Sequence, residues 1–506
     1  MNQPVSQVTK ADDLPAPASA AKERGWLAAV MPVVLIAACA ELGISVLNNS
    51  ALPVYFLHSL KIDTTVYGIL AVQFFVAEVL FKSPLGVLAD KFGRKPLMLG
   101  GALITVFTPM LLISMRYEPL AATAVATLVG FGFLRALDGL GQAALWPSLY
   151  AYIGDVVAEK KRGAAMGVLN LVYMVGMAFS FLAGGAVDKF FGPILVHDPG
   201  VTFGGQVKHL VRGAGHRLST LGHSHVPVGS HAVPSVSPAA SVPVVVAAPA
   251  HSLHAPEYYF PSFYLTSVLF AVAVIAAFAL RSKVRRVVDA GGSEQDEKIT
   301  WAAFLAAVRT VPQFLGIAFV MFAGIGCIMT LVKTFALDEF HITETAFGIL
   351  VLWPALLIGL IAVPSGYLAD KWGTTRCVRL GFLLAAIGMA GIPLLYSLKV
   401  GEHGFILAAG VMGIGSVLAF PAWLALLTSL GGEHNRGTVF GAVSTAQGVG
   451  AGVGVLLGTT LYGHFSPNKH VSHIAPFVAA AILVALATLL SMIFVREGAL
   501  RRTAAV

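Results

Sequence analysis

Charged residues are scarce in this chain. Only 11% of its 506 residues are Asp, Glu, Lys or Arg, whereas 57% are hydrophobic. Soluble domains carry about 25% charged residues, so most of the surface of this chain cannot face water. The formal net charge of +8 lies in short basic clusters between apolar runs. No basic stripe with interleaved aromatic residues is present, which argues against a nucleic-acid partner.

Cysteine and the short motifs of enzymes are also nearly absent. The 3 cysteines, Cys39, Cys327 and Cys377, lie within or beside apolar runs and show no CxxC or framework spacing. Neither disulfides nor a zinc site is therefore predicted. No GxxxxGK[ST] phosphate loop is present, which argues against ATP-driven pumping by this chain. No GxSxG elbow or HExxH helix is present either, so neither enzymatic activity nor a cofactor is expected.

Long apolar runs, in contrast, fill most of the sequence. A membrane-spanning helix needs about 20 mostly apolar residues. Twelve segments qualify, approximately at 27–48, 65–88, 97–117, 122–150, 163–187, 260–280, 313–336, 346–369, 378–397, 404–430, 437–462 and 474–495. The predicted fold class is an all-α membrane protein with twelve transmembrane helices in two six-helix bundles.

The links between these segments predict the orientation of the chain. Every second link is basic, with Lys and Arg clusters after segments two, four, six and eight. Short links rich in Lys and Arg stay in the cytoplasm. Both termini are therefore predicted to be cytoplasmic. The predicted parts are a tail at 1–26, a bundle at 27–280, a linker at 281–312, a bundle at 313–496 and a tail at 497–506.

An internal repeat relates the two halves. The sequence GVLADKFGRK, from Gly86 to Lys95, reappears after segment eight as GYLADKWG, from Gly366 to Gly373. Arg162-Gly163 before segment five likewise reappears as Arg436-Gly437 before segment eleven. Three glycines of segment five match three of segment eleven at one constant offset: Gly167, Gly176 and Gly184 with Gly441, Gly450 and Gly458.

These motifs resemble those of a known family. GVLADKFGRK resembles motif A of the major facilitator superfamily, and Arg135-Ala-Leu-Asp138-Gly-Leu-Gly resembles its motif B. Segment five resembles a degraded antiporter motif C, with Ser180-Phe181 in place of Gly-Pro. The chain is similar to the twelve-helix drug/proton antiporter branch over nearly its whole length. The resemblance implies a monomer of the bacterial inner membrane that moves a small molecule by alternating access.

The motif A charges predict a conformational latch. Asp90 lies at a helix end, where its carboxylate can meet the positive N-terminus of a neighbouring helix. By the resemblance, that helix begins near Arg436, and Arg94 pairs with Asp155. Such contacts exist in one of two rocking states, although the charges would also serve topology alone. In the second copy a threonine replaces the arginine, so a weaker latch is expected there. The predicted latch residues are Gly86, Asp90, Gly93, Arg94, Asp155, Asp370 and Arg436.

The repeated glycines lie nearly on one face of segments five and eleven and permit close backbone contact. The resemblance places those segments against the other half, across the moving interface. The predicted interface glycines are Gly167, Gly176, Gly184, Gly441, Gly450 and Gly458. Packing of a static bundle would use the same glycines.

Ionisable residues within apolar segments cost about 2.5–3.5 kcal/mol each on insertion scales, so each is a candidate for function. The candidates for proton coupling are Glu41, Asp138, Arg135 and Glu78, all in the first half. Glu41 is the first choice and Asp138 the second. Arg135 and Asp138 share a helix face and fit either a self-satisfied ion pair or a proton site. Glu78 has Lys82 four residues on, which favours a structural pair.

A histidine-rich insertion at 188–258 interrupts the first half and is predicted to be extracytoplasmic. It holds eight of the 15 histidines: His197, His209, His216, His223, His225, His231, His251 and His254. Neutral imidazoles are good ligands for transition metals. Only His223 and His225 are closely spaced, so they are the candidate metal ligands, and an outer loop of drifted composition is the alternative.

The leading hypothesis is a proton-coupled secondary transporter that exports small organic or drug-like compounds. Its partners would be a small-molecule substrate, protons and the lipid bilayer. One alternative is transport of a metal or metal chelate, motivated by the histidines. Another is a sensor or assembly factor that keeps the fold but moves no solute.

Overall fold

The computed structural model describes residues 26–115, 117–118, 123–157, 159–196, 255–280, 312–430 and 436–495. Across these residues the chain is helical almost throughout, and no strand is present among them. Lipid offers no hydrogen bonds, so each spanning segment must satisfy its own backbone groups. The predicted tails and nearly all of the predicted linker lie outside the described residues, as do His223 and His225.

The first half contains six spans. The first is continuous from α2 (Trp26–Ser45) through η1 (Val46–Ala51) and α3 (Leu52–Val54) to η2 (Tyr55–Ser59). The others are α4 (Thr64–Phe92), α5 (Arg94–Ser114), α6 (Ala124–Val156), α7 (Glu159–Val196) and α9 (Phe260–Phe278), the last preceded by η3 (Pro256–Tyr259).

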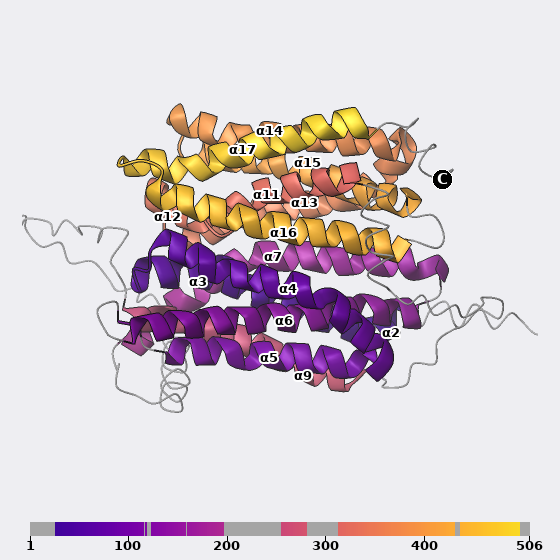
Figure 1. Cartoon of the computed structure of the whole chain (residues 1–506), viewed down its shortest axis with the longest axis horizontal. Helices are drawn as coiled ribbons and strands as arrows, with labels where there is room; N and C mark the ends of the chain where they lie inside the picture. The colour runs from indigo at the N-terminus through magenta and orange to yellow at the C-terminus, as the bar shows by residue number, and fades with distance from the viewer. Residues whose placement is uncertain are drawn as a thin grey trace, which may run out of the picture.

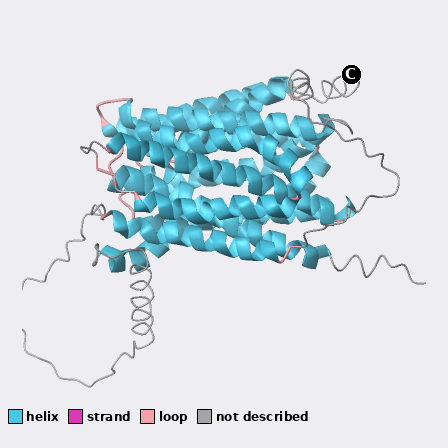
Figure 2. Ribbon diagram, turned by 60° about the horizontal axis from the view of Figure 1, so that its bottom comes forward, coloured by secondary structure: helices cyan, strands magenta, loops and turns pink. Residues whose placement is uncertain are grey.

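The second half repeats this arrangement. Its first span consists of α11 (Pro312–Met329) and α12 (Val332–Phe340). The others are α13 (Glu344–Trp372), α14 (Thr374–Ser397), α15 (Glu402–Leu430), α16 (Arg436–His464) and α17 (Lys469–Phe494). All helices run along one direction, and the two halves meet where α4 lies beside α16 and α7 beside α13 (Figure 1). Figure 2 shows the same bundle turned by 60°.

The two ends of the bundle differ in their connections. The insertion end is where α7 ends at Val196 and η3 begins at Pro256. The linker end is where α9 ends at Phe278 and α11 begins at Pro312. Because twelve antiparallel spans return the chain to its starting side, Trp26 and Phe494 both lie at the linker end.

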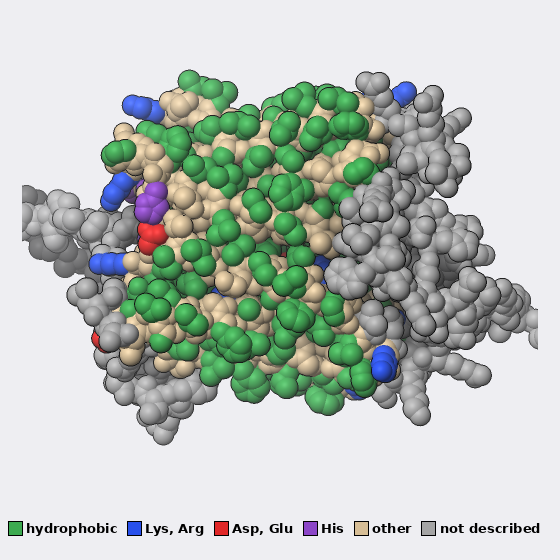
Figure 3. All heavy atoms as spheres, in the orientation of Figure 1, with side chains coloured by type: hydrophobic (Ala, Val, Ile, Leu, Met, Phe, Trp, Pro, Cys, Tyr) green, Lys and Arg blue, Asp and Glu red, His purple; other side chains and the backbone are tan. Residues whose placement is uncertain are grey.

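The predicted all-α membrane fold is confirmed. Within the described residues, 11 helices are long and apolar enough to cross a membrane. The remaining span, α13, has a shorter apolar stretch over Glu344–Leu356. Figure 3 shows hydrophobic side chains over the middle of the bundle, with charged side chains near its two ends. This distribution matches the apolar core and polar surfaces of a bilayer.

The first and the fifth predicted spans are both too short. The first span is predicted to end at 48 but continues to Ser59, because Asn49 and Ser50 are buried against neighbouring helices instead of facing water. The insertion is predicted to begin at 188, yet α7 continues to Val196. Asp188 does not end that helix because it is 1% exposed and hydrogen-bonded to Ser262.

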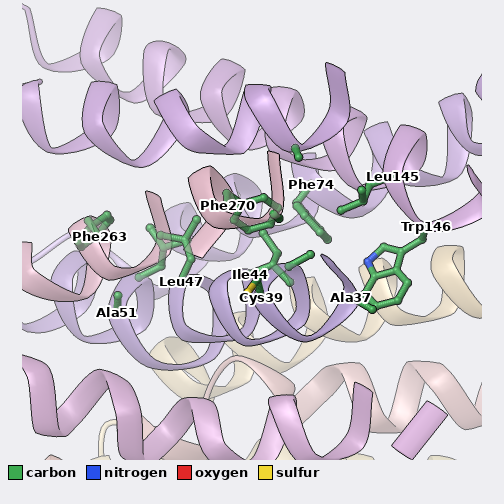
Figure 4. Close-up of a cluster of buried hydrophobic side chains, with 14 of the residues drawn as sticks. Ala37, Cys39, Ile44, Leu47, Ala51, Phe74, Leu145, Trp146, Phe263 and Phe270 are labelled. Carbon is green, nitrogen blue, oxygen red and sulfur yellow. The ribbon is translucent and has the colours of Figure 1, made fainter. Parts of the chain in front are cut away.

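Each half has its own hydrophobic core. The core of the first half gathers side chains such as Cys39, Phe74, Trp146 and Phe270 between its helices (Figure 4). The core of the second half is built from α11 to α17 and also takes in Phe181 of α7. The two halves therefore fold around separate cores and touch through a thinner layer of contacts.

The repeat is visible in the structure. Gly93 and Gly373 both take positive φ, at 100° and 92°, in the turn after the second span of each half. Lys95 donates to the carbonyls of Phe278 and Leu280 at the end of α9, both at 2.8 Å. Arg379 donates in the same way to carbonyls at the end of α17. A cation thus satisfies the free carbonyls at the last helix end of each half.

The glycines predicted at the moving interface are placed differently. A Cβ on Gly176 or Gly184 would meet Glu41 or Ser50 of the first span, in the same half. A Cβ on Gly450 or Gly458 would meet the backbone of α11, again in the same half. This corrects the expectation, because these positions pack each half internally. Nothing lies within 4 Å of a Cβ on Gly441, and Gly167 lies outside the residues whose surroundings are described.

Other glycines, on α7, α13 and α16, face the opposite half. A Cβ on Gly185 would lie 2.9 Å from the carbonyl carbon of Glu344, and one on Gly348 would lie 2.4 Å from the Cα of Leu182. On α16, Gly448 faces Val79 of α4. Close contact between the halves therefore rests on glycines other than the repeated ones. On α7 and α16 these are Gly185 and Gly448, which lie on another face of the helix, and α13 contributes Gly348.

Gly458→Ala tests the internal packing. Its Cβ would lie 1.9 Å from the carbonyl oxygen of Cys327, so α11 and α16 must move apart. We expect a loss of about 1–3 kcal/mol, the usual cost of overpacking, seen as a lower thermal unfolding temperature of the purified protein. Gly441→Ala on the same helix is the matched control and should be neutral. Equal stability of the two variants would contradict the tight α11–α16 contact.

Candidate functional site

A buried ion pair lies at the centre of the first half. Arg135 Nη1 donates to Asp138 Oδ2 at 2.9 Å, and its Nη2 donates to Asn48 Oδ1 of the first span at 2.7 Å. The hydroxyl of Thr108 donates to the other oxygen of Asp138. The guanidinium also lies over the ring of Phe74, 5.0 Å from its centroid. Of the two interpretations left open by the sequence, the geometry matches the self-satisfied pair.

A narrow cavity lies beside Arg135, between the two halves. It is lined by Arg135 and by residues of the first span, of α4 and of α11, among them Asn48, Tyr67, Phe75 and Thr330. Among the described residues, the side-chain oxygen of Asn49 is buried there without a hydrogen-bond partner. Unpaired polar atoms facing a cavity between the halves are available to a bound solute or water.

Glu41 lies deep inside α2. Glu41 is 3% exposed, and the hydroxyl of Ser45, one helical turn later, donates a hydrogen bond to its carboxylate at 2.8 Å. Gly176 of α7 leaves the space for this side chain, because a Cβ there would lie 3.1 Å from its Cγ. Tyr150 and Tyr173 lie within electrostatic range of the carboxylate. Unlike Asp138, Glu41 therefore has no cation as a described hydrogen-bond partner.

An aromatic group adjoins Glu41. Trp146 contacts both Tyr150 and Tyr173, with ring centroids 5.9 and 5.7 Å apart. Tyr150 and Tyr173 are 39% and 37% exposed, whereas Trp146 is buried. A carboxylate beside aromatic faces is an arrangement that attracts organic cations and flat apolar molecules.

Glu78 is paired as its spacing predicts. Lys82 Nζ lies 3.0 Å from Glu78 Oε1, one helical turn along α4. Both side chains are partly exposed, and exposed pairs of this type contribute little free energy. Glu78 also lies within electrostatic range of Glu41.

The predicted latch stays a prediction. The side chains of Asp90, Asp155, Asp370 and Arg436 lie outside the residues whose surroundings are described. Gly93 separates α4 from α5, which begins at Arg94, and no atom lies within 4 Å of a Cβ on Gly86. The candidate metal ligands His223 and His225 are likewise outside, and no group of three or more potential metal ligands is found among the described residues.

The two halves are joined by polar contacts at the insertion end. Lys333 of α12 is 0% exposed, and its Nζ donates to Ser50 Oγ of the first span at 2.7 Å and to Ser50 O at 3.1 Å. The same ammonium lies 2.6 Å from Glu344 Oε2 of α13. Asp188 of α7 lies within electrostatic range of both Lys333 and Glu344. One buried ammonium, one buried carboxylate and one partly buried carboxylate from both halves are thus grouped together.

Apolar and histidine contacts complete this closure. The rings of Phe181 and Phe347 pack edge to face across the halves, with centroids 5.4 Å apart. His58 Nε2 lies 3.0 Å from Asp338 Oδ1, and His464 Nε2 lies 2.9 Å from Asp63 Oδ2. Each of these pairs also joins one half to the other. The insertion end is closed in this structure.

Most of this closure is not evident from the sequence. Lys333 stands out there only as a charge within an apolar segment, and Asp188 falls just beyond the predicted end of its span. The signal available is a carboxylate close to a glycine pair, Gly184-Gly185, where two helices approach closely. The two histidine–carboxylate pairs lie in or near links, where charged residues are ordinarily solvated, so the sequence alone gives no reason to pair them.

Comparison with known sequences adds relatives of similar architecture. A segment of 179 residues is 30% identical to the class G tetracycline resistance protein of Vibrio anguillarum and covers 34% of this chain and 42% of that protein. A segment of 136 residues is 26% identical to multidrug resistance protein 2 of Bacillus subtilis, covering 27% of this chain and 31% of that protein. The matches thus span less than half the length of these curated relatives.

Solved structures match over nearly the full length. A bacterial homologue of the human lysosomal transporter Spinster, inward-facing and unoccupied, aligns with a TM-score of 0.65 at 16% identity, covering 95% of this chain and 98% of that one. The inward-open xylose transporter XylE of E. coli aligns with a TM-score of 0.64 at 12% identity, covering 95% and 99%. At these identities the likeness establishes the fold.

The family follows from the sequence model that matches both halves. The model of the Major Facilitator Superfamily matches residues 33–197 and 314–505, most of the chain, and leaves out residues 198–313, which include most of the histidine-rich insertion, α9 and the linker. The match agrees with the repeated halves and with the membrane-spanning helices described above. The chain therefore belongs to the Major Facilitator Superfamily and is a multi-pass membrane transporter, not an enzyme.

Proposed function

We propose that this transporter exports small organic or drug-like compounds in exchange for protons. The proposal rests on the burial of Glu41 in α2, where a serine hydroxyl is the described hydrogen-bond donor to its carboxylate. A buried carboxylate without a cation partner is costly when ionised and so is suited to bind and release a proton. Tyr150 and Tyr173 beside it provide a surface for an apolar or cationic organic substrate.

The named relatives support the substrate class. Two of them are a tetracycline resistance protein and a multidrug resistance protein. Arg135 and Asp138 would serve a different purpose from Glu41, because they neutralise each other and hold the first span, α5 and α6 together. Asp138 remains the second candidate for the proton.

The proposed orientation places the insertion end outside the cell. Basic residues at the linker end, such as Lys91, Arg94, Lys95, Lys371 and Arg376, favour the cytoplasm for that end. We propose the bacterial inner membrane, with both termini cytoplasmic. The structure then represents the state closed toward the outside, in which substrate enters from the cytoplasm.

Replacement of Glu41 tests the coupling. Glu41→Gln keeps the shape and the hydrogen bond to Ser45 but holds no ionisable proton. We expect proteoliposomes to lose substrate flux driven by a proton gradient, by at least about tenfold, as for loss of an essential proton-transfer group. Substrate exchange without a gradient should persist.

Glu402→Gln, at a carboxylate far from the centre of the bundle, is the matched control and should transport normally. If Glu41→Gln and Asp138→Asn both retain gradient-driven flux, the coupling lies elsewhere. Absence of flux in the unmodified protein under any gradient would favour the alternative of a non-transporting sensor.

Lys333→Met tests the buried contact that closes the insertion end. Methionine keeps an apolar stem and removes the ammonium, which leaves Glu344 and Ser50 without their donor. Breaking a buried pair on one side costs about 3–5 kcal/mol, and we expect the insertion end to open more often. The readout is the distance between spin labels at Val125 and Leu398, which are 72% and 63% exposed at the insertion end of the two halves.

The label experiment is practical because the described native cysteines are buried. Lys333→Met/Glu344→Gln is the companion variant, since it removes both charges and should recover part of the closure. An unchanged distance distribution in Lys333→Met would show that the apolar contacts alone hold this end shut.

A further inference from the structure

Two histidine–carboxylate contacts at the insertion end are related in an informative way. In one, His58 of η2 in the first half faces Asp338 of α12 in the second. In the other, Asp63 at the start of α4 in the first half faces His464 at the end of α16 in the second. Each half therefore contributes one imidazole and one carboxylate. Both contacts exist only while the halves meet at this end.

Each carboxylate also accepts hydrogen bonds from groups other than its histidine. Tyr462 donates a hydrogen bond to Asp338, and His473 lies within electrostatic range of it. Asp63 Oδ1 accepts from the backbone amides of Thr65 and Val66 at the N-terminus of α4, where a negative charge is favoured. Imidazole is the side chain whose charge ordinarily changes near neutral pH.

Protonation changes the strength of both contacts. A neutral imidazole makes an ordinary hydrogen bond to a carboxylate, and in one tautomer only. An imidazolium makes a charge-assisted one, which is roughly twice as strong. Because the carboxylates face the imidazoles only in the closed arrangement, bound protons favour closure. By reciprocity, closure favours proton binding.

The other histidine–carboxylate contacts described for α12 lie within the second half. On α12, Glu339 accepts from Tyr396 of α14 and faces His470 and His473 of α17, all in the second half. Tyr462 stacks on His473, with ring centroids 4.3 Å apart. The exposed Lys61 lies in the link before Asp63.

Solvent reaches both pairs from the insertion end. The side chains of His58 and Asp338 are 24% and 21% exposed, and those of His464 and Asp63 are 55% and 45% exposed. A proton therefore arrives at either imidazole without crossing the bundle. Glu41, by contrast, is buried in the interior of the first half and is reached only through the bundle.

We propose that His58–Asp338 and His464–Asp63 form a proton-binding clasp, at which protons from the medium outside the cell bind and hold that side of the transporter closed. The inference rests on the proposed function for its alternating states and its orientation. It adds a second proton site with a different role: Glu41 would couple the proton to transport, and the clasp would set how often the transporter opens outward at a given external pH.

The test measures the state of the insertion end as a function of pH, with no transport assay. Spin labels at Val125 and Leu398 report the separation of the halves in the purified full-length protein. For the unmodified histidines we expect the open fraction to rise roughly fivefold between about pH 5.5 and about pH 8, as two charge-assisted hydrogen bonds become ordinary ones. His58→Gln/His464→Gln keeps polar side chains at both positions and should lose most of this pH dependence.

Two further variants show whether the response comes from the paired groups themselves. His403→Gln removes a histidine that is 85% exposed at the same end and contacts only Glu402 of its own helix among the ion pairs described; it should behave as the unmodified protein does. Asp338→Asn removes one carboxylate and should partly reduce the pH dependence of the open fraction. Its thermal unfolding temperature checks that the fold is kept.

The outcomes separate this inference from the proposed function. A pH response that persists unchanged in the double histidine variant, or is absent from the unmodified protein, overturns the clasp whether or not the protein transports. A response that depends on the two histidines supports it, even where Glu41→Gln shows that coupling lies elsewhere.

Discussion

The membrane interior offers neither hydrogen bonds nor solvation for charge, and the structure depends on this constraint. The backbone meets it by forming helix. Two buried cations meet it through partners: Arg135 donates to Asp138 and Asn48, and Lys333 donates to Glu344 and Ser50. Because such groups are costly without partners, their partners determine where neighbouring helices lie. The polar contacts thus position the helices, while the apolar cores supply most of the burial.

The two halves share a scaffold but divide these contacts unequally. Lys95 and Arg379 satisfy the last helix end of each half, and Gly176 and Gly450 pack the fifth and eleventh spans against the first and seventh. The central charges belong to the first half, as the sequence indicates. The second half supplies charge at the insertion end, in Lys333 and its neighbours on α12 and α13. The sequence places all candidate membrane charges in the first half. That distribution therefore holds for the centre of the membrane only.

Local relationships were predictable from the sequence and distant ones were not. The Arg135–Asp138 and Glu78–Lys82 pairs follow from helical spacing alone, since residues three or four apart share a face. The twelve helices follow from the length of the apolar runs. The two histidine–carboxylate pairs join residues far apart in the chain, and no periodicity indicates which links meet. Four of the repeated glycines pack within one half and not between the halves, because a glycine face permits close approach without specifying the helix that approaches.

The first span links the centre of the first half to the insertion end. Along it, Ser45 binds Glu41, Asn48 binds Arg135, Ser50 accepts from Lys333 and His58 faces Asp338. Two π-helical segments, Val46–Ala51 and Tyr55–Ser59, lie in the same stretch, and such segments are frequent at functional sites because they turn side chains away from the regular helical positions.

Through this arrangement, a change of charge at Glu41 can affect the insertion end of the molecule. Gly176 allows α7 to lie directly against Glu41, and farther along the same helix Gly184 and Gly185 contact Ser50 and Glu344. The first span and α7 are therefore in contact both at the proposed proton site and at the closure. A change in how Glu41 fits against α7 acts on the helix pair that also holds Lys333 in place. The proposed proton coupling needs this property, because proton binding at the centre would have to alter which end of the bundle is open.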